Sequence, residues 1–404
     1  MPGLSSVPTI LDSDCGPSKP MQHKLLRLLL IPVTVLTLVA AILGIAELLV
    51  RFEPVTAAVP IPEGNYVQLQ ADERLFTLFA ALNATGYDEE NNERGMSDVR
   101  RQVRAALAIR GEVTSPLRPY LAMCRFIHVS QCATWVLQRG PAPRFARAAD
   151  GWALGAPAFL FFGFDRALAA FYRKADIVGL WQAQRPAYDV EMARYRDLVT
   201  PAVAEVFAYL KITQPPTEGV VVLPNLLDAY WRGYGPRVGN LSYVVMGPAV
   251  EPNIGLIQHE AMHPILNPLI DAHLAAVERS QADRLFAALK PRVAAGYRTW
   301  PNMLHESVIR AVEVQLADPK DRERLIRQEE AVGFLLVRPL AGRLAEYEAS
   351  GQTVSEFMPR LLAALNDETL LAGHFLGRLA PARRRPLAPL LDVNQLLKGR
   401  LKLG

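Results

Sequence analysis

Cysteine is scarce in this chain of 404 residues, which contains only Cys15, Cys124 and Cys132 and no Cys-x-x-Cys pair. The lack of paired cysteines excludes a cysteine-rich zinc module. Cys124 and Cys132 are eight positions apart. On one continuous helix they would lie about 12 Å apart, too far to bridge. A disulfide between them therefore requires the chain to turn in the intervening segment.

An excess of charge of one sign is also missing, since the formal net charge is only +4. The basic runs 383–385 and 399–404 lie in the C-terminal tail and have no aromatic residues interleaved with them. Nucleic-acid-binding surfaces combine clustered basic residues with such features, so we expect no nucleic-acid partner. Half the residues are hydrophobic and 21% are charged, which fits a globular protein with a membrane element.

One long hydrophobic run stands out: Leu28–Val50, 23 residues with Glu47 as the single charge. A helix of that length spans a bilayer core of about 30 Å. Three basic residues precede the run and only Arg51 follows closely, which predicts a cytoplasmic N-terminus. The alternative is a cleaved signal peptide, because the small residues at 39–41 and 55–57 suit a cleavage site. The length favours a single-pass anchor in the inner membrane, with the rest of the chain facing the periplasm or exterior.

Apolar periodicity predicts a mainly helical α+β fold. Residues 66–210 look helical, with a helix at 97–110 and another at 190–210 interrupted at Pro201. Two β-branched segments bounded by Gly, Pro and Asn, 219–227 and 240–247, are typical of strands. Later helices are predicted near 272–290, 303–317, 321–348 and 354–366.

The segment after the second strand contains His259, Glu260 and His263 on an otherwise apolar helix that begins after Asn253. Histidines four apart project from one helix face, so both imidazoles can reach one tetrahedral metal while the glutamate adjoins the open position. Chance would produce this pattern in about one chain in two hundred of this composition. Ionisable groups on an apolar helix cost several kcal/mol unless paired or metal-bound. The pattern therefore predicts a Zn²⁺ site.

Two prolines complicate this helix. Pro264 removes a backbone donor and crowds the carbonyl of Glu260, so a bend is expected there. Pro268 is expected to end the helix.

The third ligand must come from elsewhere, because position 269, where a metzincin would have histidine, is leucine. The candidates are Glu306, Glu313, His273, His305 and Asp271. Glu306, Arg310 and Glu313 share one helix face, which is either a solvated surface or part of the site. We favour Glu306. Glu313 lies about 10 Å further along the axis, so both glutamates are not expected to bind one ion.

Three segments resemble a bacterial family of exported or lipid-anchored zincin-like proteins, namely 259–269, 306–313 and 333–365. That family is catalogued only as a domain of unknown function and is related to glutamate-type zincins. The resemblance covers about residues 190–366. It implies a zincin-like core in which a small sheet accompanies the active-site helix.

The resemblance also implies roles for single residues. His259, His263 and Glu306 would bind zinc, Glu260 would be the general base, and Arg310 matches the family's arginine. The expected function is a zinc metallopeptidase with a peptide or protein substrate. In this mechanism zinc polarises the scissile carbonyl and acidifies water, and Glu260 passes the water proton to the leaving amine.

Two questions stay open at this point. The oxyanion can be stabilised by Arg310, Tyr243 or Tyr297, and the sequence does not choose among them. The rival function is an envelope scaffold or binding protein with an inactive zincin-like fold or a structural zinc, which a fourth protein ligand would favour. The predicted parts of the chain are a cytoplasmic N-terminus (1–27), an anchor (28–50), a linker (51–65), a helical part (66–210), a metallopeptidase core (211–366) and a C-terminal extension (367–404).

Overall fold

A computed structural model describes residues 19–51, 66–87, 95–110, 114–148, 156–212, 215, 217–289, 297 and 299–367. It separates into two units, Met1–Glu53 with Pro157–Phe162, and Pro54–Ala156 with Gly163–Gly404. The fold is mainly helical with one small mixed sheet, which confirms the predicted α+β class. Apart from Arg51 and Asp367, the predicted linker (51–65) and the predicted extension (367–404) lie outside the described residues.

The smaller unit is built on helix α1, Lys19–Arg51, which is longer than the predicted span. Its segment Pro32–Val50 has a mean hydropathy of 2.5, so the helix is long and apolar enough to cross a membrane. A signal sequence near the N-terminus has the same length and composition. Near its end, the Glu47 carboxylate accepts a hydrogen bond of 2.8 Å from the backbone N–H of Phe159. Phe159 belongs to the short 3₁₀ helix η2, Ala158–Phe161.

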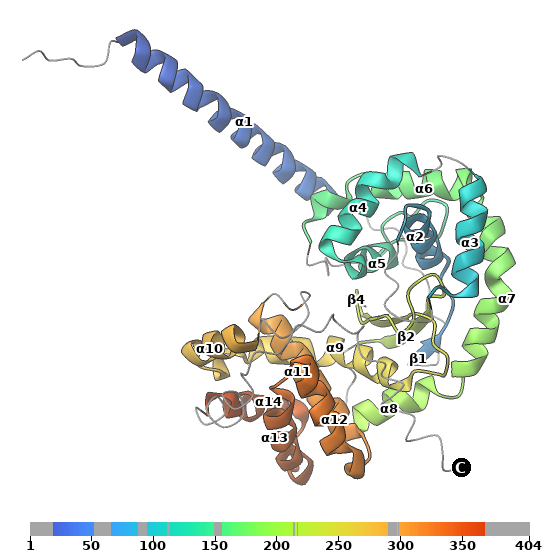
Figure 1. Ribbon diagram of the computed structural model, residues 1–404, viewed down its shortest axis with the longest axis vertical. Helices are drawn as coiled ribbons and strands as arrows, with labels where there is room; N and C mark the ends of the chain where they lie inside the picture. Colours follow the sequence, from blue (N-terminus) through green and yellow to red (C-terminus); the bar gives the residue numbers. More distant parts are fainter. Residues whose placement is uncertain are drawn as a thin grey trace, which may run out of the picture. The chain divides into compact units, whose positions relative to one another are not determined.

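The first half of the larger unit is helical, as predicted (Figure 1). Its elements are α2 (Glu73–Ala84), α3 (Asp98–Ile109), η1 (Ser115–Leu117), α4 (Arg118–Ile127), α5 (Val129–Leu137), α6 (Phe164–Lys174), α7 (Ile177–Tyr195) and α8 (Val199–Tyr209). The break predicted at Pro201 falls earlier, between Tyr195 and Val199. Pro201 lies in the first turn of α8, where its missing N–H costs nothing.

Five short strands form the sheet: β1 (Val67–Leu69), β2 (Gly219–Pro224), β3 (Gly233–Tyr234), β4 (Arg237–Val238) and β5 (Leu241–Met246). The two strands expected from the sequence, β2 and β5, pair in parallel, and β1 joins β2 in parallel. Strands β3 and β4 run antiparallel along the other side of β5. One sheet face, including Val222 and Val244, packs against α8 and the following helix.

That helix is α9, Ile254–Ala272, and it leads into the C-terminal helices (Figure 1). These are η3 (Leu274–Ala276), α10 (Arg279–Leu289), α11 (Trp300–Leu316), α12 (Pro319–Val332), α13 (Val337–Ala349), α14 (Val354–Ala363) and η4 (Ala364–Asn366). Fully buried side chains of α9, α11 and α13, such as Leu266, Ile309 and Leu340, share one core.

Two sequence predictions about these helices are wrong. Pro268 does not end α9, which continues to Ala272 with Ile270 fully buried beyond it. Burial of that last turn offsets the hydrogen bond lost at the proline. The single helix expected at 321–348 is two helices, because Gly333 takes φ 108° and caps α12. Glycine at this position ends a helix readily, since it tolerates the left-handed conformation.

Candidate metal centre

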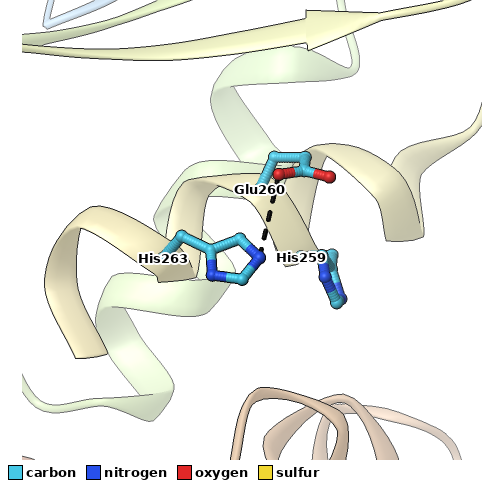
Figure 2. A group of neighbouring side chains, drawn as sticks. All are labelled: His259, Glu260 and His263. Carbon is cyan, nitrogen blue, oxygen red and sulfur yellow. Dashed lines mark ion pairs between the residues drawn. The ribbon is translucent and has the colours of Figure 1, made fainter. Parts of the chain in front are cut away.

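Helix α9 carries the His-Glu-His motif on a rigid, well-capped element. Its N-cap is Asn253, whose side chain accepts a hydrogen bond of 3.0 Å from the backbone N–H of Leu256. Figure 2 shows His259, Glu260 and His263 projecting from this one helix. Ligand atoms of these three residues lie within 4.8 Å of one another, so the group can hold a metal ion.

Helix α11 brings Glu306 to the same point. Its Oε1 lies 3.5 Å from Nε2 of His259, and its Oε2 lies 3.9 Å from Nε2 of His263. Tetrahedral zinc with bonds of about 2.1 Å separates its ligand atoms by roughly 3.4 Å. Each histidine therefore has one oxygen of Glu306 at close to this separation. Buried Val308 and Ile309 hold α11 in the core that it shares with α9.

Glu260 also approaches this point. Its Oε2 lies 3.9 Å from Nε2 of His263, and the side chain of Glu260 is only 8% exposed. Two carboxylates, Glu260 and Glu306, are thus within reach of one ion. Glu306 approaches both histidines from a second helix, whereas Glu260 lies between them on their own helix.

The second nitrogen of each histidine ring is also engaged. Nδ1 of His259 lies 3.1 Å from Oε1 of Glu313, and Nδ1 of His263 lies 3.4 Å from Oδ1 of Asn267. A hydrogen bond at Nδ1 fixes the tautomer and ring orientation of a metal-binding histidine. Both rings therefore keep Nε2 for the shared centre.

Arg310 holds the carboxylate of Glu306 in place. Its Nη2 lies 2.7 Å from Oε1 of Glu306, and its Nη1 lies 3.0 Å from Oε2 of Glu329 on α12. The guanidinium carbon also lies 4.3 Å from the ring centroid of Phe334. Three contacts from different elements leave the guanidinium little freedom, so it fixes the carboxylate that faces the histidines.

The histidines have opposite electrostatic surroundings. Burial opposes the charge of His259, but the carboxylates of Glu313 and Glu306 outweigh it and raise the pKa of His259 to about 10. Burial and the neighbouring charge of His259 lower the pKa of His263 to about 4. The carboxylates draw a proton onto His259 for the same reason that they favour a divalent cation.

The carboxylates differ as well. Burial opposes the charge of Glu306, but Arg310 and the histidines outweigh it and lower its pKa to about 2. Burial raises the pKa of Glu260 to about 7. Four glutamates line this part of the cavity with one arginine: Glu260, Glu306, Glu313, Glu329 and Arg310. Such a donor set, two histidines among buried carboxylates, suits a bound cation.

A cavity of about 580 Å³ opens beside these residues and is lined on another side by residues 231–237, which we call the strand wall. The strand wall lies directly against Glu260. A methyl group on Gly233 would fall 2.5 Å from Oε1 of Glu260, and one on Gly235 would fall 2.4 Å from its backbone oxygen. The backbone contact at Gly235 leaves no room for a side chain, whereas a side chain at Gly233 would require Leu256 and Glu260 to move.

The start of α5 completes the cavity lining. Cys124 and Cys132 form a disulfide, because α4 ends at Ile127 and the chain turns at His128 with φ 83°. The condition for pairing that the sequence left open is therefore met. The ring of His128 meets that of Tyr234 edge-on, with 6.0 Å between centroids, so the turn between α4 and α5 contacts the strand wall.

The comparisons with known proteins give one match. A family model described as a domain of unknown function (DUF4932) matches residues 249–364, less than a third of the chain. The matched stretch includes both helices that carry the candidate metal ligands, α9 and α11. No curated protein and no solved structure matches the chain.

The structure gathers most of the residues that the sequence singled out. His259, Glu260, His263, Glu306 and Arg310 all line the cavity, as does Tyr297. Four other candidates have different partners or places: His305, Asp271, His273 and Tyr243. His305 Nε2 lies 2.8 Å from Asp271 Oδ1, and His273 caps α9. Tyr243 alternates with the residues that face α9, so it lies on the other face of the sheet, where the charge of Arg74 acts on it.

Sequence reasoning missed the roles of Glu329 and of the two glycines. Glu329 lies on α12, beyond the motif, and nothing in its local sequence distinguishes it from the surface acids around it. Gly233 and Gly235 carried a signal that was available, since two glycines flanking a tyrosine just before β4 suggest close backbone approach.

Proposed function

We propose that this protein is a zinc-dependent metallopeptidase that is anchored in the membrane. The observation that carries the proposal is the approach of Glu306 from α11 to Nε2 of both histidines on α9, at 3.5 and 3.9 Å. Two histidines and a glutamate with a further glutamate beside them form a donor set that binds zinc and leaves a position open. The adjoining cavity has room for a peptide segment.

His259, His263 and Glu306 would hold the ion. Zinc at such a site polarises a substrate carbonyl and lowers the pKa of water towards neutrality. Glu260 adjoins both the histidines and the cavity, so its carboxylate can accept the proton of the attacking water and return it to the leaving amine. Hydrolysis of a peptide bond needs this shuttle, because an amine leaves only when protonated.

Arg310 and Tyr297 divide the remaining tasks. Because Arg310 is bound to Glu306 and Glu329, we assign it first to holding the ligand. Tyr297 lines the cavity, where the charges of Glu306 and Arg310 act on its hydroxyl. Its hydroxyl is the donor that we assign to the developing oxyanion.

The sheet supports a zincin-like core as part of this proposal. Helix α9 packs beneath β5, and the strand wall borders the cavity. A backbone segment beside the scissile bond can bind an extended peptide through main-chain hydrogen bonds. Both elements fit the small sheet with an active-site helix that the resemblance implies.

The location is proposed on two observations. Helix α1 is long and apolar enough to anchor the chain in the inner membrane, and the basic residues ahead of its apolar segment favour a periplasmic or exterior domain. The Cys124–Cys132 disulfide suits an oxidising compartment. A reporter enzyme that works only after export should be active when it is fused after Leu365. Activity of a reporter that works only in the cytoplasm would contradict this location.

The function is tested with Glu260→Gln in the full chain. The variant should bind as much zinc as the parent and lose at least about 10³-fold of its turnover of a mixture of fluorogenic peptides. Glu218→Gln, at a surface carboxylate that hydrogen-bonds with Asn240, serves as the matched control and should behave as the parent. Equal turnover in parent and Glu260→Gln would reject the mechanism. A zinc-loaded parent that cleaves none of the peptides would favour the scaffold function.

A further inference from the structure

The charges that line the cavity are segregated. Among the described residues that line it, every acidic side chain lies at the proposed metal site or forms an ion pair with Arg310. The strand wall instead carries Arg232 and Arg237. A substrate in this cavity therefore meets a metal site at one wall and positive charge at another.

Arg237 supplies the more accessible of these charges. It lies on β4, paired with Ser242 of β5, and its side chain is exposed. Its Nε approaches the backbone oxygen of Gly239 at 3.5 Å, which is at the limit of a hydrogen bond. A guanidinium held so weakly can turn to a carboxylate and bind it with two parallel hydrogen bonds.

Arg232 has a different role, because a buried acid shares its charge. Burial raises the pKa of Asp228, while the nearby charge of Arg232 lowers it. Asp228 also accepts hydrogen bonds from Tyr87 and Tyr234, at 2.7 and 2.9 Å. The charge of Arg232 is thus partly offset by Asp228, and Arg237 is the residue that can contact a ligand.

The position of Arg237 sets where on the substrate that carboxylate must lie. Gly235 lies against Glu260, the base of the proposed mechanism. Arg237 is two residues further along, about 7 Å in an extended chain. An extended peptide that runs beside the strand wall covers the same distance in about two residues.

We propose that the cavity selects peptides that carry a carboxylate within about two residues of the scissile bond, and that Arg237 binds this carboxylate. The group is either the side chain of Asp or Glu or the C-terminal carboxylate of the peptide. This specificity rests on the proposed peptidase function, although the binding of the carboxylate does not require turnover.

The test uses calorimetric titration of the full-length, zinc-loaded Glu260→Gln variant, which should bind peptides without cleaving them. Three sets of acetylated alanine hexapeptides are compared. The first are amides with one Glu at each internal position in turn, and the second are amides with Gln at the same positions. The third is the neutral peptide with a free C-terminal carboxylate.

At least one Glu peptide, or the free-carboxylate peptide, should bind about tenfold more tightly than its neutral amide. The set that shows the gain identifies the source of the carboxylate. Adding Arg237→Gln should abolish the gain, and Arg237→Glu should reverse it. The control Arg185→Gln, at an exposed residue that pairs with Asp189 on α7, should leave it intact.

Three results would overturn the specificity: equal binding of all peptides, binding of none, or a carboxylate preference that survives Arg237→Gln. These outcomes are distinct from failure of the proposed function. If the preference is found but the parent with Glu260 restored cleaves none of the bound peptides, the cavity binds carboxylates without being a peptidase.

Discussion

His259 on α9 and Glu313 on α11 are joined by a contact of 3.1 Å between Nδ1 and Oε1. The sequence made Glu313 a rival to Glu306 as the third ligand. The structure places its carboxylate at the ring nitrogen that faces away from the shared centre, while Glu306 faces Nε2. We therefore propose that Glu313 orients the histidine and that Glu306 is the ligand.

Replacing Glu313 tests this role. Glu313→Gln should lower zinc affinity by about 10- to 100-fold, because the weaker acceptor holds His259 less firmly. The stoichiometry at saturating zinc should stay at that of the parent. Competition with a chromogenic chelator measures both quantities. Glu323→Gln, at an exposed residue on α12 that pairs with Arg338, is the control. Loss of all zinc at saturation would instead make Glu313 a ligand.

Gly235→Ala should impair catalysis while zinc stays bound. The added methyl would lie 2.4 Å from the backbone oxygen of Glu260, so the strand wall or the base must move. We expect kcat to fall by at least about tenfold, as a displacement of 1 Å can cost 10²-fold. Gly342→Ala, on α13 with nothing within 4 Å of the new methyl, is the matched control. An unchanged kcat for Gly235→Ala would show that the strand wall does not position Glu260.

The metal motif was predictable because its geometry is local. The spacing of His259 and His263 fixes their common helix face, and the apolar stripe beside Glu306 fixes which way α11 packs. The partners of these residues depend on contacts between elements. The contact of Arg310 with Glu329 requires α12 to fold back over α11, and no local pattern specifies that arrangement.

The helix boundaries show the same division. The capping box of Thr353 and Glu356 was predictable, and both of its hydrogen bonds form. The end of α9 was not. A proline rule places it at Pro268, but burial of Ile270 in the shared core extends the helix by one turn. Local chemistry locates caps reliably, whereas tertiary packing decides whether a helix breaker acts.

The disulfide should stabilise the larger unit. Closing the short loop between Cys124 and Cys132 is worth about 2.5 kcal/mol in the chain-entropy account. The double variant Cys124→Ser/Cys132→Ser should therefore unfold at a lower urea concentration than the parent. Its free energy of unfolding should be smaller by about 2.5 kcal/mol. Cys15→Ser should leave the midpoint unchanged. An unaltered midpoint in the double variant would contradict a native disulfide.

Asp72 should make stability depend on acidity. Burial alone would raise its pKa, but the charge of Arg74 and backbone hydrogen bonds outweigh burial and lower it. A group whose pKa falls on folding stabilises the folded state fully when the pH is above the pKa of the unfolded state. This stabilisation is lost as the pH drops through the pKa of the folded state. Asp72→Asn should cost about 3 kcal/mol at pH 7. The cost should shrink below about pH 4, as measured by urea unfolding. A cost independent of pH would contradict the ion pair.

The most direct test of the account is the zinc content of two glutamate variants. Full-length parent, Glu306→Ala and Glu260→Gln are equilibrated with the same low free-zinc buffer, and zinc per chain is measured by atomic mass spectrometry. The account predicts one zinc in the parent and in Glu260→Gln, and little in Glu306→Ala, because Glu306 meets both histidines. Zinc retained by Glu306→Ala but lost from Glu260→Gln would contradict it and make Glu260 the third ligand.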